Sequence, residues 1–251
     1  MSSIKSRRIV VKIGTSALMG KGGFIGVNSI KSLAAQIAEI KNSGKQVMLV
    51  TSGAIGAGMK ELGIKLRPND VVMRQVCAAI GQPVIMSKYR SLFGRHGIKV
   101  AQILLTRDAL SSRKSCINLQ NSISRLLDLG VMPIINENDP ISIDEIGRSF
   151  GDNDLLSAML SLKTRADLLV ILTDVDGLLD KGGSIVARIT EINKSIKSLC
   201  TDKGSGTGGM LSKLEAADLL LKEGVPTIIG NAKYSLLDLL ENEKIRTIIC
   251  K

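Results

Sequence analysis

The sequence predicts an α/β fold: a three-layer αβα sandwich with a mostly parallel central sheet. Short apolar, β-branched runs alternate along the chain with longer stretches of helical periodicity, which is typical of a parallel sheet with helices on both faces. The composition agrees, because 44% of the 251 residues are hydrophobic and only 2% are aromatic. A core of Ile, Leu, Val, Ala and Met favours a sheet covered by helices over a β-sandwich.

Seven segments are expected to form strands, with helices between them. The expected strands cover residues 8–13, 46–50, 99–105, 131–135, 167–172, 227–229 and 246–249. Helices are expected from a cap at Asn28 to about Lys41, between Thr106 and Gly130, over 155–163 and over 211–222. Residues 141–150 alternate apolar and polar side chains, which indicates a hairpin.

The chain is expected to form one domain over residues 1–251, with a weak seam near residue 165. Residues 1–8 lack the apolar stretch of a signal peptide, and no apolar run reaches transmembrane length. The four cysteines form no C-x-x-C pair. A cytoplasmic protein with reduced thiols is therefore expected.

The chain is basic, with 34 Lys and Arg against 23 Asp and Glu and a net charge of +11. Such a charge attracts anions, from nucleotides to RNA, although a solvated basic surface explains it equally well. The charges are scattered without long runs, so a nucleic-acid-binding arm is not expected.

Two lysines and two glycine-rich turns are candidates for phosphate binding. Lys12 nearly ends the first expected strand and Gly14 follows it; such a lysine is costly to bury unless it meets an anion or snorkels to water. Residues 51–58 follow the second strand and open a helix, where backbone N–H groups favour an anion or simply allow a tight turn. Residues 204–213 form a glycine-rich loop leading into a helix, with Lys213 in its first turn, an arrangement that suits phosphates.

Three acidic turns also follow strands or cap helices. Residues 136–140 (Asn-Glu-Asn-Asp-Pro) follow the fourth expected strand, and residues 151–154 (Gly-Asp-Asn-Asp) precede a helix. Each is consistent with an ordinary turn, but together they indicate a substrate with an ammonium group, or a metal. Residues 172–177 end the fifth strand and suit a ribose or an indirect contact to Mg²⁺. Ligands of open α/β sheets bind at the carboxyl ends of the strands, so all these motifs are expected at one edge.

Three common site types do not fit. Gly204, Gly206 and Gly209 match G-x-G-x-x-G, but a helical pattern precedes them instead of the first strand of a βαβ unit. Lys213 lacks the preceding glycine of a P-loop, so phosphate binding outside that class is indicated. The lone histidine, His96, is expected in a surface turn, and no G-x-S-x-G motif accompanies it as a hydrolase would require.

The order and spacing of the motifs resemble those of the amino acid kinase family over nearly the whole chain. The strings that carry the resemblance are Thr-Ser-Gly-Ala-Ile at 51–55, Ile-Asn-Glu-Asn-Asp at 135–139, Gly-Asp-Asn-Asp at 151–154 and Gly-Thr-Gly-Gly-Met at 206–210, with Lys213. Each string is weak alone, but all of them in order are specific. They are most similar to those of the members that phosphorylate the side-chain carboxylate of glutamate. Many bacterial relatives continue into a PUA domain, which is not expected within these 251 residues.

The resemblance implies roles at matching positions. Lys12 and Lys213 would stabilise the transferring phosphoryl group, and Asp154 would hold the two lysines in place. Ser52, Asp139 and Asn153 would bind glutamate, with Asp139 facing its amino group. The ATP-binding residues would be Lys12, Gly14, Thr173, Asp174, Thr207, Gly208, Gly209, Met210, Leu211, Ser212 and Lys213. No metal site on the protein itself and no tightly bound cofactor are implied.

The implied activity transfers the terminal phosphoryl group of ATP, as its Mg²⁺ complex, to L-glutamate. The product would be L-glutamyl 5-phosphate, the first intermediate on the route to proline. A carboxylate is already ionised at neutral pH and needs no general base, so motifs without histidine suit this reaction. The resemblance also implies proline as a feedback inhibitor, a homodimer or homotetramer, and a glutamyl phosphate reductase as partner. No membrane partner is expected.

Two other functions remain open on the sequence alone. The first is another kinase of the same fold, acting on acetylglutamate, aspartate or UMP; Asp139 and Asn153 favour a substrate with a free amino group. The second is a basic α/β module that binds RNA or senses a metabolite. The net charge suggests it, whereas the lysines and acidic turns argue against it.

Overall fold

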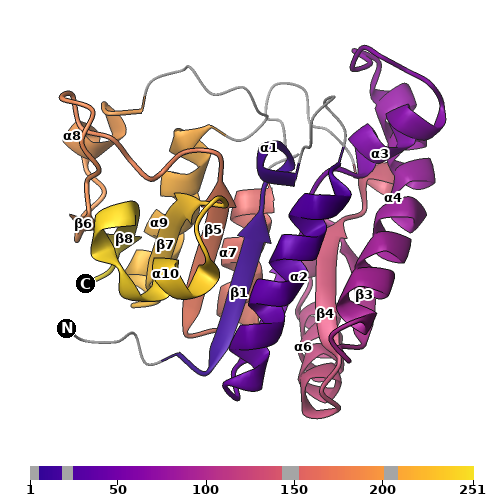
Figure 1. Cartoon of the computed structure of the whole chain (residues 1–251), viewed down its shortest axis with the longest axis horizontal. Coiled ribbons are helices and arrows are strands. Elements are labelled where there is room, and N and C mark those ends of the chain that lie inside the picture. The colour runs from indigo at the N-terminus through magenta and orange to yellow at the C-terminus, as the bar shows by residue number, and fades with distance from the viewer. Residues whose placement is uncertain (1–5, 19–24, 143–152, 201–208) are drawn as a thin grey trace.

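The computed structural model describes residues 6–18, 25–142, 153–200 and 209–251, apart from the side chain of Arg107, and the structural statements below refer to these residues. Their strands form one eight-stranded sheet with the order β3-β4-β2-β1-β5-β7-β8-β6. Helices cover both faces of this sheet (Figure 1). The predicted three-layer α/β architecture is thus confirmed.

Parallel pairing dominates the sheet. Its strands are β1 (Arg8–Ile13), β2 (Gln46–Val50), β3 (Val100–Leu105), β4 (Met132–Glu137), β5 (Leu168–Thr173), β6 (Arg188–Ile189), β7 (Thr227–Asn231) and β8 (Arg246–Ile249). Only the β7–β8 pair is antiparallel among the pairs of these strands. β1 pairs with β2 on one side and with β5 on the other. The chain thus leaves β1 in one direction and later returns to its opposite side, which makes the carboxyl ends of β1 and β5 a topological switch point.

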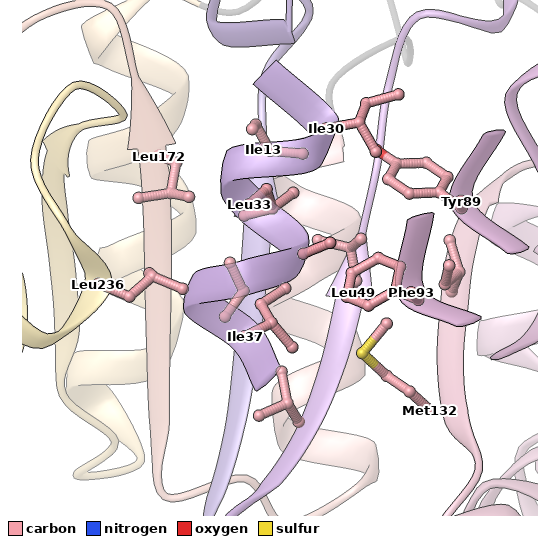
Figure 2. Close-up of a cluster of buried hydrophobic side chains, with 14 of the residues drawn as sticks. Ile13, Ile30, Leu33, Ile37, Leu49, Tyr89, Phe93, Met132, Leu172 and Leu236 are labelled. Atoms are coloured by element: carbon pink, nitrogen blue, oxygen red, sulfur yellow. The ribbon is translucent and has the colours of Figure 1, made fainter. Parts of the chain in front are cut away.

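The two faces of the sheet carry separate hydrophobic cores. The helices are α1 (Thr15–Leu18), α2 (Val27–Asn42), α3 (Ala54–Glu61), α4 (Val71–Gly94), α5 (Arg107–Ser111), α6 (Arg113–Asp128), α7 (Asn153–Lys163), α8 (Lys194–Lys197), α9 (Met210–Lys222) and α10 (Leu236–Glu241). The core beneath α2, α4 and α10 is shown in Figure 2, where Leu33 and Ile37 of α2 lie among Leu49 and Phe93. The second core lies beneath α6, α7 and α9. No described helix is long and apolar enough to span a membrane.

Strand alternation decides which face receives each side chain of β1. Successive residues of a strand point to opposite faces. Ile9, Val11 and Ile13 join the α2 core, while Val10 joins the core beneath α7 and α9. Lys12 follows the same alternation as Val10. It is therefore directed toward α7 and α9, and α7 supplies its partner Asp154.

The seven predicted strands agree with the structure to within two residues at each end, whereas β6 was not predicted; the helical region predicted between Thr106 and Gly130 is confirmed, and one predicted helix cap was wrong. Asn28 does not cap α2, which begins one residue earlier with extended Gly26 at its N-cap. The region between Thr106 and Gly130 holds two helices, because Ser112 is extended and caps α6 through the Ser115 N–H. The predicted hairpin over 141–150 falls mainly outside the described residues, and Ile141 ends the 3₁₀ turn η1 (Asp139–Ile141).

The crossing of α3 and α4 depends on Gly81. A Cβ at this position would lie 1.9 Å from the Ala54 carbonyl oxygen and 2.4 Å from the Gly58 nitrogen, and backbone atoms cannot move aside. Gly81→Ala is therefore expected to lower the free energy of unfolding by about 3 kcal/mol, the upper range for overpacking. Urea unfolding followed by circular dichroism measures this loss.

Gly94 provides the matched control on the same helix. A Cβ there meets no atom within 4 Å, so Gly94→Ala should be neutral or stabilise by up to about 1 kcal/mol through helix propensity. Equal effects of the two substitutions would contradict the close helix crossing.

Candidate active site

A buried carboxylate joins two buried lysines at the switch point. Asp154 Oδ1 lies 2.6 Å from Lys12 Nζ, and Asp154 Oδ2 lies 3.1 Å from Lys213 Nζ. The Asp154 side chain is fully buried, and the two lysines are 4% and 5% exposed. Together the three side chains carry one net positive charge in a place that largely excludes water. Such a site favours an incoming anion, because electrostatic interactions are stronger where water is excluded.

Three separate elements position this Lys–Asp–Lys cluster. Lys12 is the penultimate residue of β1, Asp154 lies in the first turn of α7, and Lys213 lies in the first turn of α9. An acidic residue is stabilised near a helix N-terminus by the helix dipole. The hydroxyl of Ser212 also donates to Asp154 Oδ2 at 3.0 Å. The structure thus brings together the three residues predicted to be catalytic, and Asp154 lies between the two lysines.

The absence of a side chain at Gly14 leaves space beside the Lys12 ammonium group. The Gly14 N–H donates to the Leu172 carbonyl oxygen at 3.2 Å, which ties the end of β1 to β5. A Cβ at this position would lie 3.5 Å from Lys12 Nζ. A larger side chain would therefore occupy space next to the ammonium group, where an anion would approach.

The predicted substrate residues Ser52 and Asn153 are in direct contact. Asn153 Nδ2 donates to Ser52 Oγ and to the Thr51 carbonyl oxygen, each at 2.8 Å, and to Asn136 Oδ1 at 3.0 Å. Asn153 directly precedes Asp154, so this amide cluster adjoins the Lys–Asp–Lys cluster. Ser52 is half-buried, which leaves part of its side chain accessible to a ligand.

Asp139 lies in η1, which follows β4 at the same edge of the sheet and packs against α4. Its side chain is half-buried. In the same turn, the Ser142 hydroxyl donates to Glu137 Oε1 at 2.5 Å. The acidic turn predicted at 136–140 is therefore divided between the end of β4, which holds Asn136 and Glu137, and the 3₁₀ turn η1, which holds Asp139.

The other side of the switch point holds Thr173 and Asp174. Thr173 ends β5 and its hydroxyl donates to Asp174 Oδ1 at 3.1 Å. Asn231, at the end of β7, donates through Nδ2 to the Asp174 carbonyl oxygen at 2.9 Å and to Asp176 Oδ1 at 2.8 Å. The hydrogen bond from Lys233 lowers the pKa of Asp176, so this turn is held by a charged pair at neutral pH.

A cavity of about 490 Å³ opens at the carboxyl ends of β1, β5 and β7. Its volume lies in the range of small-molecule sites. The lining residues come from these strand ends, from the short helix α1 and from α2, and they include Ile13, Ser16, Leu172, Thr173, Asp174 and Asn231. The predicted residues Thr173 and Asp174 thus border a hollow at the place where α/β sheets bind ligands.

The remaining predicted ATP-binding residues lie around the start of α9. Gly209 is its N-cap, and Met210, Leu211 and Ser212 form its first turn with Lys213. Thr207 and Gly208 lie outside the described residues. Within the described ranges, no three His, Cys, Asp or Glu side chains group as they would to hold a metal ion.

Two buried amides of the site were not among the predicted site residues. Asn136, 2% exposed, donates through Nδ2 to Gln82 Oε1 at 2.8 Å. Gln82 lies on α4 and is 7% exposed. Asn136 stood in a motif that the sequence marked, and its place at the end of an apolar strand is a usable signal, because a buried amide needs partners. Gln82 offered no comparable signal.

Comparison with known proteins shows which family this chain resembles. A profile described as "Amino acid kinase family" matches residues 7–231. A curated glutamate 5-kinase from Clostridium acetobutylicum is 41% identical over 250 residues, covering 96% of this chain and 90% of the relative. A glutamate 5-kinase from Methanosarcina barkeri is 44% identical over 258 residues, covering 96% of this chain and 67% of that longer relative.

The fold comparison agrees with the sequence comparisons. The solved structure of a carbamate kinase from Giardia lamblia, bound to AMP-PNP, superposes with a TM-score of 0.68 over 99% of each chain at 17% identity. That likeness concerns the fold alone. The profile match over most of the chain is what decides membership: the chain belongs to the amino acid kinase family.

Proposed function

We propose that this chain catalyses ATP-dependent phosphorylation of the side-chain carboxylate of L-glutamate, giving L-glutamyl 5-phosphate and ADP. The observation that carries the proposal is the buried Lys12–Asp154–Lys213 cluster directly beside the Ser52–Asn153 pair. The two glutamate 5-kinases, at 41% and 44% identity, support the choice of substrate. The reaction is the first step of proline biosynthesis.

In the proposed reaction, a side-chain carboxylate oxygen of glutamate attacks the γ-phosphorus of ATP. A bond forms between that oxygen and phosphorus, the bond from phosphorus to the β,γ-bridging oxygen breaks, and ADP leaves with both electrons. Negative charge spreads over the transferring group and the leaving oxygen, and the Lys12 and Lys213 ammonium groups stabilise it. Mg²⁺ enters with ATP as part of the substrate complex and neutralises further phosphate charge.

Asp154 has a positioning role in this mechanism. Each of its oxygens faces one lysine, at 2.6 Å and 3.1 Å, so the carboxylate sets the separation of the two ammonium groups. No proton needs to be removed from an ionised carboxylate nucleophile. Asp154 therefore serves as counter-charge and holder and does not act as a general base.

The two substrates are assigned to opposite sides of the switch point. Ser52, Asn153 and Asp139 bind glutamate, with Asp139 toward its ammonium group, in the half formed by residues of about 1–165. Gly14, Thr173, Asp174 and the start of α9 bind ATP, mainly in the half of about 166–251. Lys12 and Asp154 lie where the halves meet, which suits in-line transfer between two bound substrates.

Regulation and assembly are proposed on family grounds. We infer that proline inhibits the reaction as the end product, that the chain assembles as a homodimer or homotetramer in the cytoplasm, and that a glutamyl phosphate reductase consumes the product. Of these, proline inhibition is the simplest to test, because added proline should lower the rate of ADP release.

A substrate screen tests the proposed activity. ADP release from MgATP is measured with glutamate, aspartate, acetylglutamate and UMP. The proposal expects release with glutamate at least about 100-fold faster than with the others, since a site built around one substrate's polar groups rejects analogues that lack them. Turnover of acetylglutamate or UMP with none of glutamate would overturn it. Binding of ATP without turnover, together with salt-dependent RNA binding, would instead support a non-catalytic module.

A further inference from the structure

A chain of three amide side chains runs from α4 to the proposed glutamate site. Asn136 Nδ2 donates to Gln82 Oε1 at 2.8 Å, and Asn153 Nδ2 donates to Asn136 Oδ1 at 3.0 Å. Asn153 Nδ2 also lies 2.8 Å from Ser52 Oγ and 2.8 Å from the Thr51 carbonyl oxygen, so its two hydrogens are shared among three acceptors. Gln82, Asn136 and Asn153 are each less than 10% exposed, so their hydrogen bonds are protected from competition by water.

The direction of this amide chain is fixed at the Thr51 carbonyl. A backbone carbonyl only accepts hydrogen bonds, so the Asn153 amide must turn its Nδ2 toward it. With Asn153 turned in this way, Asn136 must present its Oδ1 acceptor to Asn153. The Nδ2 of Asn136 then faces Gln82 on α4. Gln82 Oε1 accepts from Asn136 Nδ2 and is the last acceptor in this chain of hydrogen bonds. The opposite orientation of Asn153 would place its Oδ1 against the Thr51 carbonyl oxygen, two acceptors face to face.

This polarity decides what the site offers to a ligand. Ser52 Oγ accepts from Asn153, and within the described ranges no acceptor is found for the Ser52 hydroxyl hydrogen. Ser52 is thereby left as a donor. Asn153 Oδ1, buried, likewise has no donor in the described part of the chain. A donor and an acceptor side by side complement the carboxylate and ammonium groups of an amino acid.

We propose that Gln82 is a positioning residue for substrate recognition: by accepting from Asn136 Nδ2 it stabilises Asn136, and through it Asn153, in the orientation that the Thr51 carbonyl requires, so that Ser52 donates to a carboxylate of the substrate. This inference rests on the proposed function, in which Ser52 and Asn153 bind glutamate. Gln82 itself touches no reacting group. Its effect should therefore appear in the recognition of glutamate and not in the phosphoryl transfer step.

The substitution Gln82→Met tests the proposal, because methionine has a similar length and offers no strong acceptor. We expect the KM for glutamate to rise about tenfold, the scale of one hydrogen bond to a charged group, while the KM for ATP and kcat change less than about twofold. Tyr89→Phe is the matched control. It removes another buried hydrogen bond from α4, between the hydroxyls of Tyr89 and Thr51 at 2.6 Å, but leaves the amide chain intact. It should lower the melting temperature and leave the KM for glutamate unchanged.

A double-mutant cycle with Ser52→Ala separates positioning from a merely structural role. In the Ser52→Ala background, Gln82→Met should change the KM for glutamate less than about twofold, because the hydroxyl that it orients is gone. Additive effects, or an unchanged KM in active Gln82→Met protein, would overturn the inference. Melting temperatures identify an assay temperature at which every variant is folded. If the unmodified protein turns over no glutamate, the proposed function fails and this inference fails with it.

Discussion

Replacing Lys213 by alanine is expected to lower kcat by about 10²–10³-fold, the usual loss when one transition-state donor is removed. Lys213 is 5% exposed and its Nζ lies 3.1 Å from Asp154 Oδ2, so water cannot readily take its place. The KM values for ATP and glutamate should change much less, because the charge that Lys213 is proposed to stabilise develops during transfer. Steady-state ADP release measures both parameters.

Lys222 on the same helix provides the control for this experiment. It forms an exposed i,i+4 ion pair with Asp218, with 69% of its side chain accessible. Lys222→Ala should leave kcat within about twofold, since surface ion pairs contribute little. A folded Lys213→Ala protein with unchanged kcat would contradict the assignment of Lys213 to the transferring phosphoryl group.

The substitution Asp154→Asn is expected to have the largest effect on stability. It removes the carboxylate charge that faces two buried ammonium groups, and breaking a buried ion pair in this way costs about 3–5 kcal/mol. It should also lower kcat by at least about 10²-fold, because the lysines lose their common holder. Urea unfolding in the absence of nucleotide measures the stability loss.

Asp218→Asn serves as the surface control for Asp154→Asn. It removes the carboxylate of the Lys222 ion pair on α9 and should change the free energy of unfolding by less than about 1 kcal/mol. MgATP should recover more stability in Asp154→Asn than in Asp218→Asn, because phosphate oxygens can replace the lost negative charge. Equal stability losses in the two variants would contradict a buried charge cluster that depends on Asp154.

Most of the sheet could be predicted from the sequence because β1, β2, β4, β5, β7 and β8 are almost wholly buried and therefore appear as apolar, β-branched runs; the short, partly exposed β6 could not. The helix α4 could not. Gly81 and Pro83 both argue against a helix interior, yet both lie inside α4, which is 24 residues long. Gly81 is required by the contact with α3, and Pro83 leaves the Ala79 carbonyl without its helical partner on an exposed part of the helix, where water can reach it. Tertiary packing overrides local propensity here.

Some residues of the candidate site could also be predicted from the sequence, and others could not. The motifs at strand ends had to meet at one edge of a parallel sheet, so Lys12, Ser52 and Thr173 could be assigned to one site. The bridging role of Asp154 came only from the family resemblance, because nothing in the local sequence indicates that it faces two lysines. Gln82 could not be predicted at all, since it enters the site through a hydrogen bond to Asn136, 54 positions away in sequence.

Trapping the acyl phosphate tests the central claim most directly. Hydroxylamine attacks the carbonyl carbon of glutamyl 5-phosphate and releases phosphate, leaving a hydroxamate that ferric ions colour. The proposed activity predicts a hydroxamate signal that requires MgATP and glutamate together and is absent with aspartate or acetylglutamate. No hydroxamate from folded protein that binds ATP, with glutamate and hydroxylamine in excess, would contradict it.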